Sequence, residues 1–167
     1  LKVKRIVTIC PHCYNMIKNE YPQLGGIYEV WHHSEFVHSL LKSGKLKLAK
    51  NIDQSLTYHD SCYLGRHNNV YDQPREILKG IWGVKVIEMQ RHRSNSFCCG
   101  AGGGRLWLEE TIGEKINVNR TDQALRLGVS VVATACPYCL TMFEDGLKTR
   151  EKEKTVQVSD IAELVER

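Results

Sequence analysis

Apolar, β-branched stretches alternate along the chain with stretches in which apolar residues recur at helical spacing. The first kind predicts strands, at residues 3–9, 28–31, 55–58, 84–89, 129–134 and 156–158. The second kind predicts helices, over residues 14–20, 34–41, 74–82, 105–110 and 117–127 and again after Asp160. Segment 129–134 is almost wholly apolar, which is typical of a strand that is covered on both faces.

Three residues mark where predicted helices begin or end. Ser34 suits the N-cap of the helix that follows it, and Pro74 suits a first helical turn. Gly128 suits the position just past a helix end. The regular alternation of strands and helices predicts an α/β fold, Rossmann-like, with a mainly parallel sheet and flanking helices.

The cysteines fall just beyond the carboxyl ends of predicted strands. They form four groups along the chain: Cys10 with Cys13, then Cys62, then Cys98 with Cys99, and finally Cys136 with Cys139. Open α/β sheets bind ligands at the edge formed by the carboxyl ends of their strands. We therefore expect the last five thiols to converge, although long stretches of chain separate them.

Composition narrows the class of protein. With 167 residues, 42% of them apolar and 25% charged, the chain can form a globular core, and a net charge of +4 does not argue for nucleic acid. No stretch approaches the length of a membrane span or resembles the apolar part of a signal peptide. Seven cysteines cannot all pair into disulfides. Metal ligands or redox thiols in a reducing cytoplasm are therefore expected.

The last five cysteines form the pattern C-x35-CC-x36-C-x-x-C, from Cys62 to Cys139. A single zinc ion needs four ligands, and the two C-x-x-C turns of the chain could supply them. That arrangement leaves Cys62 and the adjacent Cys98 and Cys99 unexplained. Adjacent side chains on an extended backbone point to opposite sides, whereas a polynuclear cluster binds thiolates that arrive from several directions. The pattern therefore favours an iron–sulfur cluster over zinc.

A glycine-rich run follows the cysteine pair, at Gly100 and at 102–104. Bare backbone can approach a ligand closely, and its N–H groups can donate hydrogen bonds to cluster sulfides and tune their potential. The run matches neither the P-loop nor the G-x-G-x-x-G spacing of a dinucleotide site. Gly100 is accordingly a candidate cofactor-binding residue.

The chain contains an internal repeat with an offset of about 126 residues, measured from Cys10 to Cys136. A strand, a C-P-x-C turn, a helix, a second strand and a second helix occur near the start and again near the end. The first copy lacks its upstream half. We therefore expect the chain to be a fragment in which residues 1–54 are the closing half of a first repeat and residues 55–167 a complete second one.

Three motifs together resemble the cysteine-rich CCG domain of the B and D subunits of heterodisulfide reductase. They are H-D-S-C from His59, C-C-G-A-G-G-G from Cys98 and A-C-P-Y-C from Ala135. The same domain occurs in the iron–sulfur subunits of glycolate oxidase and anaerobic glycerol-3-phosphate dehydrogenase. The resemblance implies an oxidoreductase subunit that reduces a disulfide or relays electrons between a flavoprotein and a quinone or ferredoxin. A cytoplasmic location is also expected, with association to the inner face of the membrane through such partners.

The same resemblance implies a four-iron, four-sulfide [4Fe-4S] cluster, non-cubane in the best-understood relatives. Carried over by position, the ligands are Cys62, Cys98, Cys99, Cys136 and Cys139. Ser61 stands where relatives commonly have proline, and this departure removes no ligand. Cys10 and Cys13 match only the closing turn of a first motif, so they are a candidate partial second site, for a cluster or for zinc in the intact protein.

Residues near the cysteines have further candidate roles. His59 lies three residues before Cys62 and is a candidate catalytic residue, as a proton source or hydrogen-bond donor; the alternative is a histidine bonded to strand-end backbone. Trp82 and Trp107 are expected in the core or over the cluster. Two other functions stay open: a zinc-stapled interaction module with spare thiols, and a metal-free thiol–disulfide redox protein.

Overall fold

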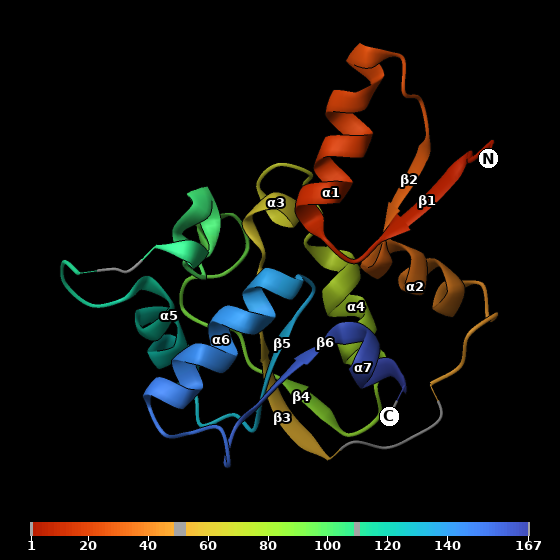
Figure 1. Cartoon of the computed structure of the whole chain (residues 1–167). Helices are drawn as coiled ribbons and strands as arrows, with labels where there is room; N and C mark the ends of the chain where they lie inside the picture. The colour runs from red at the N-terminus through yellow and green to blue at the C-terminus, as the bar shows by residue number, and fades with distance from the viewer. Residues whose placement is uncertain (1, 49–52, 109–110, 167) are drawn as a thin grey trace.

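Short strands alternate with helices in the computed structural model, which describes residues 2–48, 53–108 and 111–166 (Figure 1). The strands are β1 (Arg5–Thr8), β2 (Glu29–His32), β3 (Gln54–Tyr58), β4 (Val84–Val86), β5 (Val131–Thr134) and β6 (Gln157–Asp160). The α-helices are α1 (Pro11–Asn15), α2 (His33–Lys42), α3 (Cys62–Gly65), α4 (Asp72–Gly80), α5 (Ile116–Leu125), α6 (Pro137–Thr149) and α7 (Ile161–Glu166). Tighter or wider turns form η1 (Met16–Glu20), η2 (Tyr21–Leu24), η3 (Arg93–Asn95) and η4 (Gly102–Trp107). Within these described ranges, no helix is long and apolar enough to cross a membrane.

The strands form two sheets in which every described pairing is parallel. Four strands are arranged in the order β4-β3-β5-β6, and β1 pairs with β2 in a separate two-stranded sheet. The prediction of an α/β fold with parallel strands and flanking helices is confirmed. Strand β5 is buried at every position, as its unbroken apolar sequence predicts.

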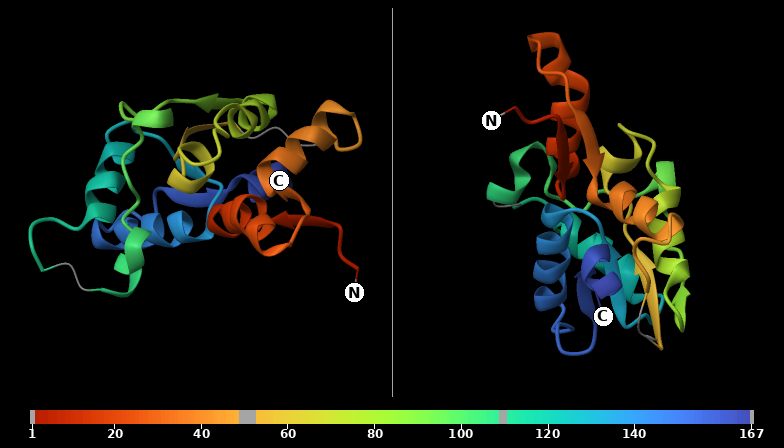
Figure 2. Two further views of the ribbon diagram at one scale, coloured as in Figure 1. Left: turned by 90° about the horizontal axis from the view of Figure 1, so that it is seen from above. Right: turned by 90° about the vertical axis from the view of Figure 1, so that its right-hand side faces the viewer.

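Alternating side chains of the four-stranded sheet build a core on each of its faces. Val131 and Ala133 pack with apolar residues of α4 and α7, whereas Val132 points the other way, toward Phe143 and helix α5. Helices α5 and α6 therefore cover one face of the sheet, and α4 with α7 covers the other (Figure 2). This enclosure leaves the ends of the strands as the places where functional side chains can gather.

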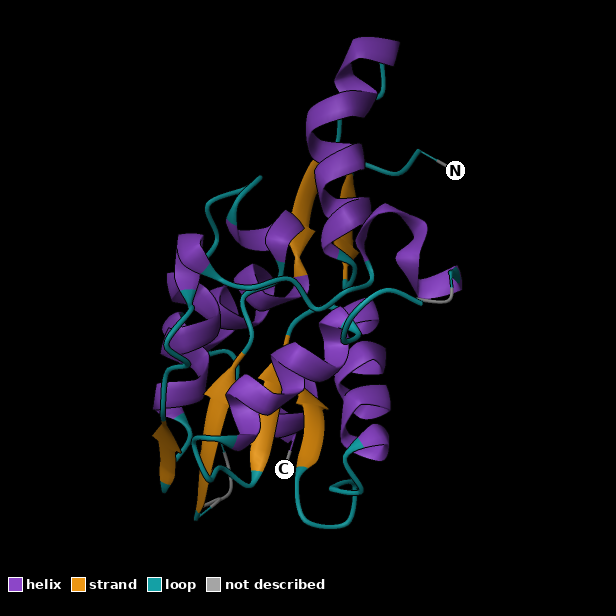
Figure 3. Ribbon diagram, turned by 90° about the vertical axis from the view of Figure 1, so that its left-hand side faces the viewer, coloured by secondary structure: helices purple, strands orange, loops and turns teal. Residues whose placement is uncertain are grey.

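The carboxyl ends of the two sheets face each other (Figures 1 and 3). The pairs β1–β2 and β5–β6 have the same arrangement. Thr8 lies opposite His32 in the first pair, and Thr134 lies opposite Asp160 in the second. The sheets are joined where the buried His33 Nε2 lies 2.9 Å from Asp160 Oδ1. The cysteines that follow β1 and β5 are thus brought to one region of the molecule.

Helix α2 begins before Ser34, so the prediction of Ser34 as its N-cap is wrong. The N-cap is His32, whose Nδ1 accepts the backbone N–H of Ser34, and Glu35 closes a capping box by accepting the His32 N–H at 3.2 Å. Asp160 caps α7 in the same way, accepting the Ala162 N–H at 2.9 Å. The ring nitrogen of His32 accepts the Ser34 N–H, so the cap lies two residues before Ser34.

Several other predicted boundaries differ from the structure. The helix predicted over 74–82 ends at Gly80, because Ile81 is extended and Gly83 has a φ of 78°. Trp82 is 76% exposed and Trp107 82% exposed, so the prediction of a core position is wrong for both, and Trp107 instead lines a groove beside Cys10 and Cys13. The strand predicted at 84–89 is confined to β4, and of the helix predicted at 105–110, positions 109–110 lie outside the described residues.

His32 makes folding sensitive to acid. Its ring is fully buried, Nδ1 accepts a hydrogen bond from the backbone of Ser34, and Nε2 donates to the Ile9 carbonyl at 3.3 Å. Burial, and then the charge of the adjacent His33, lowers the pKa of His32 from 6.5 to about 3. The folded protein therefore keeps this ring neutral at pH values where an unfolded chain would protonate it.

We expect the free energy of unfolding to fall by about 1.4 kcal/mol for each pH unit from His32 alone as the pH drops from 6.5 toward 3, because only the unfolded state binds the proton there. The variant His32→Asn keeps an acceptor for the cap and should lose this part of the slope. Urea unfolding at a series of pH values measures it, with the exposed His67→Gln as control. Equal slopes in all three proteins would contradict the assignment.

Candidate metal centre

Each of the last five cysteines is held at the carboxyl edge of the four-stranded sheet. Cys62 opens α3 after β3, and the pair Cys98 and Cys99 lies in the loop between η3 and η4. Cys136 is the N-cap residue of α6, with extended backbone, and Pro137 at the first helical position carries the chain into the helix. Cys139 follows in the first turn of α6, so the C-P-Y-C sequence places both of its thiols at the start of one helix.

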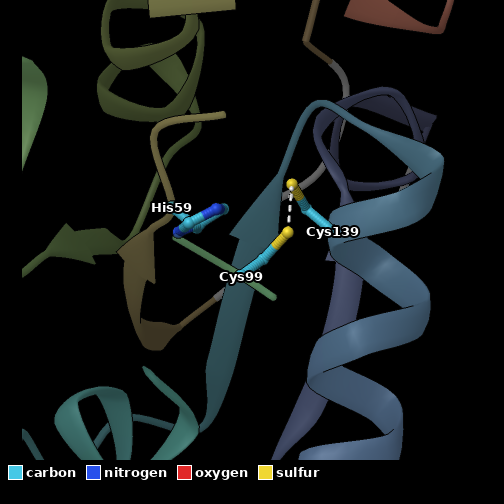
Figure 4. Close-up of side chains that lie close together, drawn as sticks. All are labelled: His59, Cys99 and Cys139. Carbon is cyan, nitrogen blue, oxygen red and sulfur yellow. Dashed lines mark hydrogen bonds between the residues drawn. The ribbon is translucent and has the colours of Figure 1, made fainter. Parts of the chain in front are cut away.

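Three of these thiols are buried against one another. Cys99, Cys136 and Cys139 are 5%, 1% and 3% exposed and form one cluster, against which Met142 packs. The Cys139 thiol donates to Cys99 Sγ over 3.3 Å (Figure 4). Parallel pairing of β3, β4 and β5 is what unites cysteines that are far apart in the chain.

The other two cysteines are half-buried at the side of this cluster. Cys98 Sγ accepts the backbone N–H of Gly100 at 3.3 Å, and its thiol is hydrogen-bonded to that of Cys99. Burial, followed by the negative charge of Cys99, raises the pKa of Cys62, which places Cys62 within electrostatic reach of the cluster. Cys98 therefore contacts the buried thiols directly, and Cys62 lies near enough to interact with them electrostatically.

The pKa values of the clustered thiols differ in direction from one cysteine to the next. Hydrogen bonds from Cys139 and then Cys98 lower the pKa of Cys99, and a hydrogen bond from Cys139 lowers the pKa of Cys136 to about 5. The pKa of the donor Cys139 is correspondingly raised. Since the thiolate is the form that binds metal, the cluster holds part of its ligand set ready at neutral pH.

His59 lies beside the sulfurs. Its backbone N–H donates to the Ala133 carbonyl at 2.9 Å and so continues the β3–β5 ladder by one residue. Its ring is buried, lies edge-on to Phe143 at 5.1 Å, and points toward the sulfurs of Cys99 and Cys139 (Figure 4). A ring nitrogen and the two sulfurs all lie within 4.8 Å of one another. His59 thus combines strand-end bonding through its backbone with a ring that faces the thiols.

The first C-P-H-C turn lies against this site from the opposite sheet. His12 hydrogen-bonds Cys10, with Nδ1 and Sγ 3.8 Å apart, and also Cys136. These bonds raise the pKa of His12 to about 9. A groove of about 290 Å³ runs beside the turn, between the exposed Cys13, the glycine run at 102–104 and Tyr138. His12 therefore links Cys10 to Cys136, and the exposed Cys13 lies in the groove beside this turn.

Gly100 occupies a position in which any side chain would be strained. Its φ is +97°, and an added Cβ would lie 3.1 Å from Asn117 N and 3.2 Å from the Met142 methyl group. Its N–H is the donor to Cys98. The glycine therefore lets the backbone turn tightly between the cysteine pair and helix α5.

We expect Gly100→Ala to lower the free energy of unfolding by about 2 kcal/mol, because an L-residue is strained at this φ and the methyl group meets fixed backbone. Gly102→Ala is the matched control, since an added Cβ there has no neighbour within 4 Å. Urea unfolding of both variants beside the wild type measures the difference. Equal losses would show that the constraint at Gly100 is absent.

Two buried arginines lie near the site and were not predicted from the sequence. Arg75 is 2% exposed and bonds both Asp60 and Glu88, and Arg120 is fully buried next to His59. Arg120 follows Asn117 by three positions and precedes Ala124 by four, so it lies on the buried face of α5. A charged residue at a core-facing helical position was the signal available in the sequence.

The residues present fit an iron–sulfur cluster. The donors are thiols that bear no disulfide, several are buried away from water, and a glycine N–H already points at one sulfur. No carboxylate belongs to the compact donor group found among the described residues, which is His59 with two thiols. Soft sulfur donors of this kind select iron–sulfur clusters or zinc over hard cations such as magnesium.

Comparison with known proteins places the chain among iron–sulfur proteins. It is 55% identical over 163 residues to the probable iron-sulfur-binding oxidoreductase FadF of Bacillus subtilis, a match covering 98% of this chain and 23% of that protein. It is 50% identical to the EtfAB:quinone oxidoreductase of Syntrophomonas wolfei, over 98% of this chain and 24% of that protein. It is 35% identical to the D subunit of the dihydromethanophenazine:CoB–CoM heterodisulfide reductase of Methanosarcina barkeri, over 97% and 40% respectively.

The chain thus spans about a quarter of the length of the first two relatives and two fifths of the third. Residues 56–144 match the family described as the cysteine-rich domain, CCG. In this structure the matched residues run from β3 into the middle of α6. The family resemblance inferred from the three cysteine motifs is confirmed. This chain belongs to the CCG cysteine-rich domain family of iron–sulfur oxidoreductases.

Proposed function

We propose that the chain is the cluster-binding part of an electron-transfer oxidoreductase subunit. The proposed ligands of one four-iron, four-sulfide cluster, non-cubane as in the best-understood relatives, are Cys62, Cys98, Cys99, Cys136 and Cys139. The observation that carries the proposal is the burial of Cys99, Cys136 and Cys139 in one cluster, with Cys98 and Cys62 beside it. When bound, such a cluster accepts and returns electrons at a potential set by its surroundings.

The chain's own residues would support that chemistry in three ways. Gly100 donates its N–H to Cys98, which stabilises negative charge on that sulfur. Met142 packs against the buried thiols and limits the access of water to them. His59 offers a ring nitrogen beside Cys99 and Cys139, from which it could donate a hydrogen bond or a proton.

The activity of the whole protein is part of the same proposal. The relative named as an EtfAB:quinone oxidoreductase supports electron relay from a flavoprotein to a quinone. The heterodisulfide reductase relative supports reduction of a disulfide, and ferredoxin-like or other redox subunits are the proposed partners. We place the protein in the cytoplasm, at the inner face of the membrane through these partners.

We also propose that the chain holds one and a half Rossmann-like repeats. Residues 55–167 would form the complete CCG domain and residues 1–54 the closing half of a preceding one. The matching pairs β1–β2 and β5–β6, each followed by a capped helix, support this division. Cys10 and Cys13 would then serve a second site, a cluster or zinc, in the intact protein.

Anaerobic purification of the protein tests the proposal directly. Iron and acid-labile sulfide should be present in equal amounts, and the oxidised or reduced protein should show the paramagnetic resonance of a four-iron cluster. Bound zinc without labile sulfide would falsify the cluster assignment. Metal-free protein that still reduces small disulfides would instead support thiol chemistry at the cysteine pairs.

A single zinc ion is the second candidate, because His59, Cys99 and Cys139 already lie close enough to share one ion. This arrangement leaves Cys62 without a role. Zinc binding therefore predicts that Cys62→Ser keeps the full metal content, whereas cluster binding predicts its loss. Metal analysis of that variant separates the two candidates.

A further inference from the structure

Arg120 is fully buried, and among the described residues its guanidinium bonds a histidine ring, an amide and a hydroxyl group. Its guanidinium donates from Nη1 to Gln123 Oε1 at 2.8 Å, from Nη2 to Ser96 Oγ at 3.3 Å and from Nε to His59 Nδ1 at 3.3 Å. Within the described ranges, no carboxylate forms an ion pair with it. The side chain thus carries a positive charge into the interior without a carboxylate to compensate it.

The contrast with Arg75 shows that this is unusual within the same protein. Arg75 is as deeply buried, yet it is paired with the carboxylates of Asp60 and Glu88. A buried guanidinium without a counter-charge costs several kcal/mol, so a nearby negative charge is expected to offset it. Asp60 is already paired with Arg75. The sulfurs of Cys99 and Cys139 lie within 4.8 Å of the His59 ring that Arg120 contacts, so negative charge at these sulfurs is the remaining compensation close to Arg120.

Electrostatics agree with this assignment. Burial lowers the pKa of Arg120 to about 10, and the negative charges of Asp60 and then of Cys139 and Cys99 oppose that shift. At neutral pH the guanidinium is therefore protonated.

The bond between Arg120 and His59 also fixes the hydrogen of the imidazole ring. A guanidinium N–H can only donate, so Nδ1 of His59 must be an acceptor. In a neutral ring the hydrogen then resides on Nε2. The ring points toward the sulfurs of Cys99 and Cys139 (Figure 4), so its remaining nitrogen can serve them as an N–H donor.

We infer that Arg120 is a positioning residue for the cluster, holding the His59 ring as an N–H donor to the ligand sulfurs and supplying a fixed positive charge that raises the cluster's reduction potential. The inference rests on the proposed function, because it needs a redox cluster at these cysteines. Hydrogen bonds to sulfur and nearby positive charge both favour the reduced, more negative state.

The test compares reduction potentials in complete, cluster-loaded protein, measured by redox titration with paramagnetic resonance detection. Arg120→Met removes the charge with little change of volume and should shift the reduction equilibrium at least tenfold toward the oxidised cluster, which is about 59 mV for a one-electron couple. Arg120→Lys keeps the charge and should stay within about threefold of wild type. Arg126→Met, an exposed position at the end of the same helix, is the matched control and should not shift it.

Iron and sulfide analysis of the wild type comes first, since a protein without a cluster refutes the proposed function itself. With a cluster present, a wild-type potential in Arg120→Met overturns the inference, and so does an Arg120→Lys shift as large as that of Arg120→Met. If Arg120→Met does not load iron, the iron content and reduction potential of Arg120→Lys test the inference instead. Loading with a potential near wild type supports the role of the charge, and failure to load overturns it.

Discussion

Replacement of Cys98 by serine is expected to lower the iron content of the protein by more than tenfold and to abolish the cluster's paramagnetic resonance. Cys98 Sγ lies beside the buried thiols, where it receives the Gly100 N–H and contacts Cys99. Even the loss of an outer partner of a metal ligand costs about 10–100-fold in affinity, so the loss of a ligand itself should cost at least as much. Iron, zinc and sulfide analysis of anaerobically purified variant measures the effect.

Met142→Leu is the matched control for this experiment. Met142 packs against the same thiols, so its replacement changes the packing of the site without removing a sulfur ligand. Its iron content should stay near that of the wild type. If Cys98→Ser also keeps its metal, the adjacent cysteine pair is not used as proposed, and a single ion at His59, Cys99 and Cys139 becomes the better explanation.

The placement of the cysteines at the carboxyl edge of the sheet could be predicted from the sequence, because it depends only on where the strands end and on their parallel pairing. β-branched runs located the strands that precede Cys62 and Cys136, and parallel strands bring their carboxyl ends to one edge. The contact between His12 and Cys136 could not be predicted in this way. It depends on how the separate β1–β2 sheet docks against the larger one, and no periodicity in the sequence encodes that orientation.

The errors concern residues whose surroundings come from distant segments. Trp82 has a large apolar side chain of the kind expected in a core, but α4 ends two residues before it and the side chain lies in solvent. Arg120 carries no prediction from the sequence, and its charge alone would favour a surface position, yet α5 turns it inward toward His59 and Ser96. In both cases the tertiary contacts, rather than the intrinsic preference of the residue, determine its burial.

Arg75 connects three segments near Cys62: the end of β3, helix α4 and the loop that follows β4. Its guanidinium forms two bonds to Asp60, at 2.7 and 2.8 Å, and two to Glu88, at 2.6 and 2.9 Å. Asp60 also accepts the backbone N–H of Arg93 at 2.6 Å. The network thereby fixes the end of β3, helix α4 and the loop after β4 relative to one another, and Asp60 lies directly between His59 and the turn to Cys62.

We expect Arg75→Met to lower the free energy of unfolding by about 3–5 kcal/mol, because it leaves the buried Asp60 carboxylate without its counter-charge. Arg5→Ala, which breaks a solvent-exposed pair with Glu29, should leave stability unchanged. Adding Asp60→Asn to Arg75→Met removes the unpaired charge and should recover part of the loss. Urea unfolding of the four proteins measures these differences. If the double variant is no more stable than Arg75→Met, the loss comes from packing of the long side chain, and the charge network does not hold the turn in place.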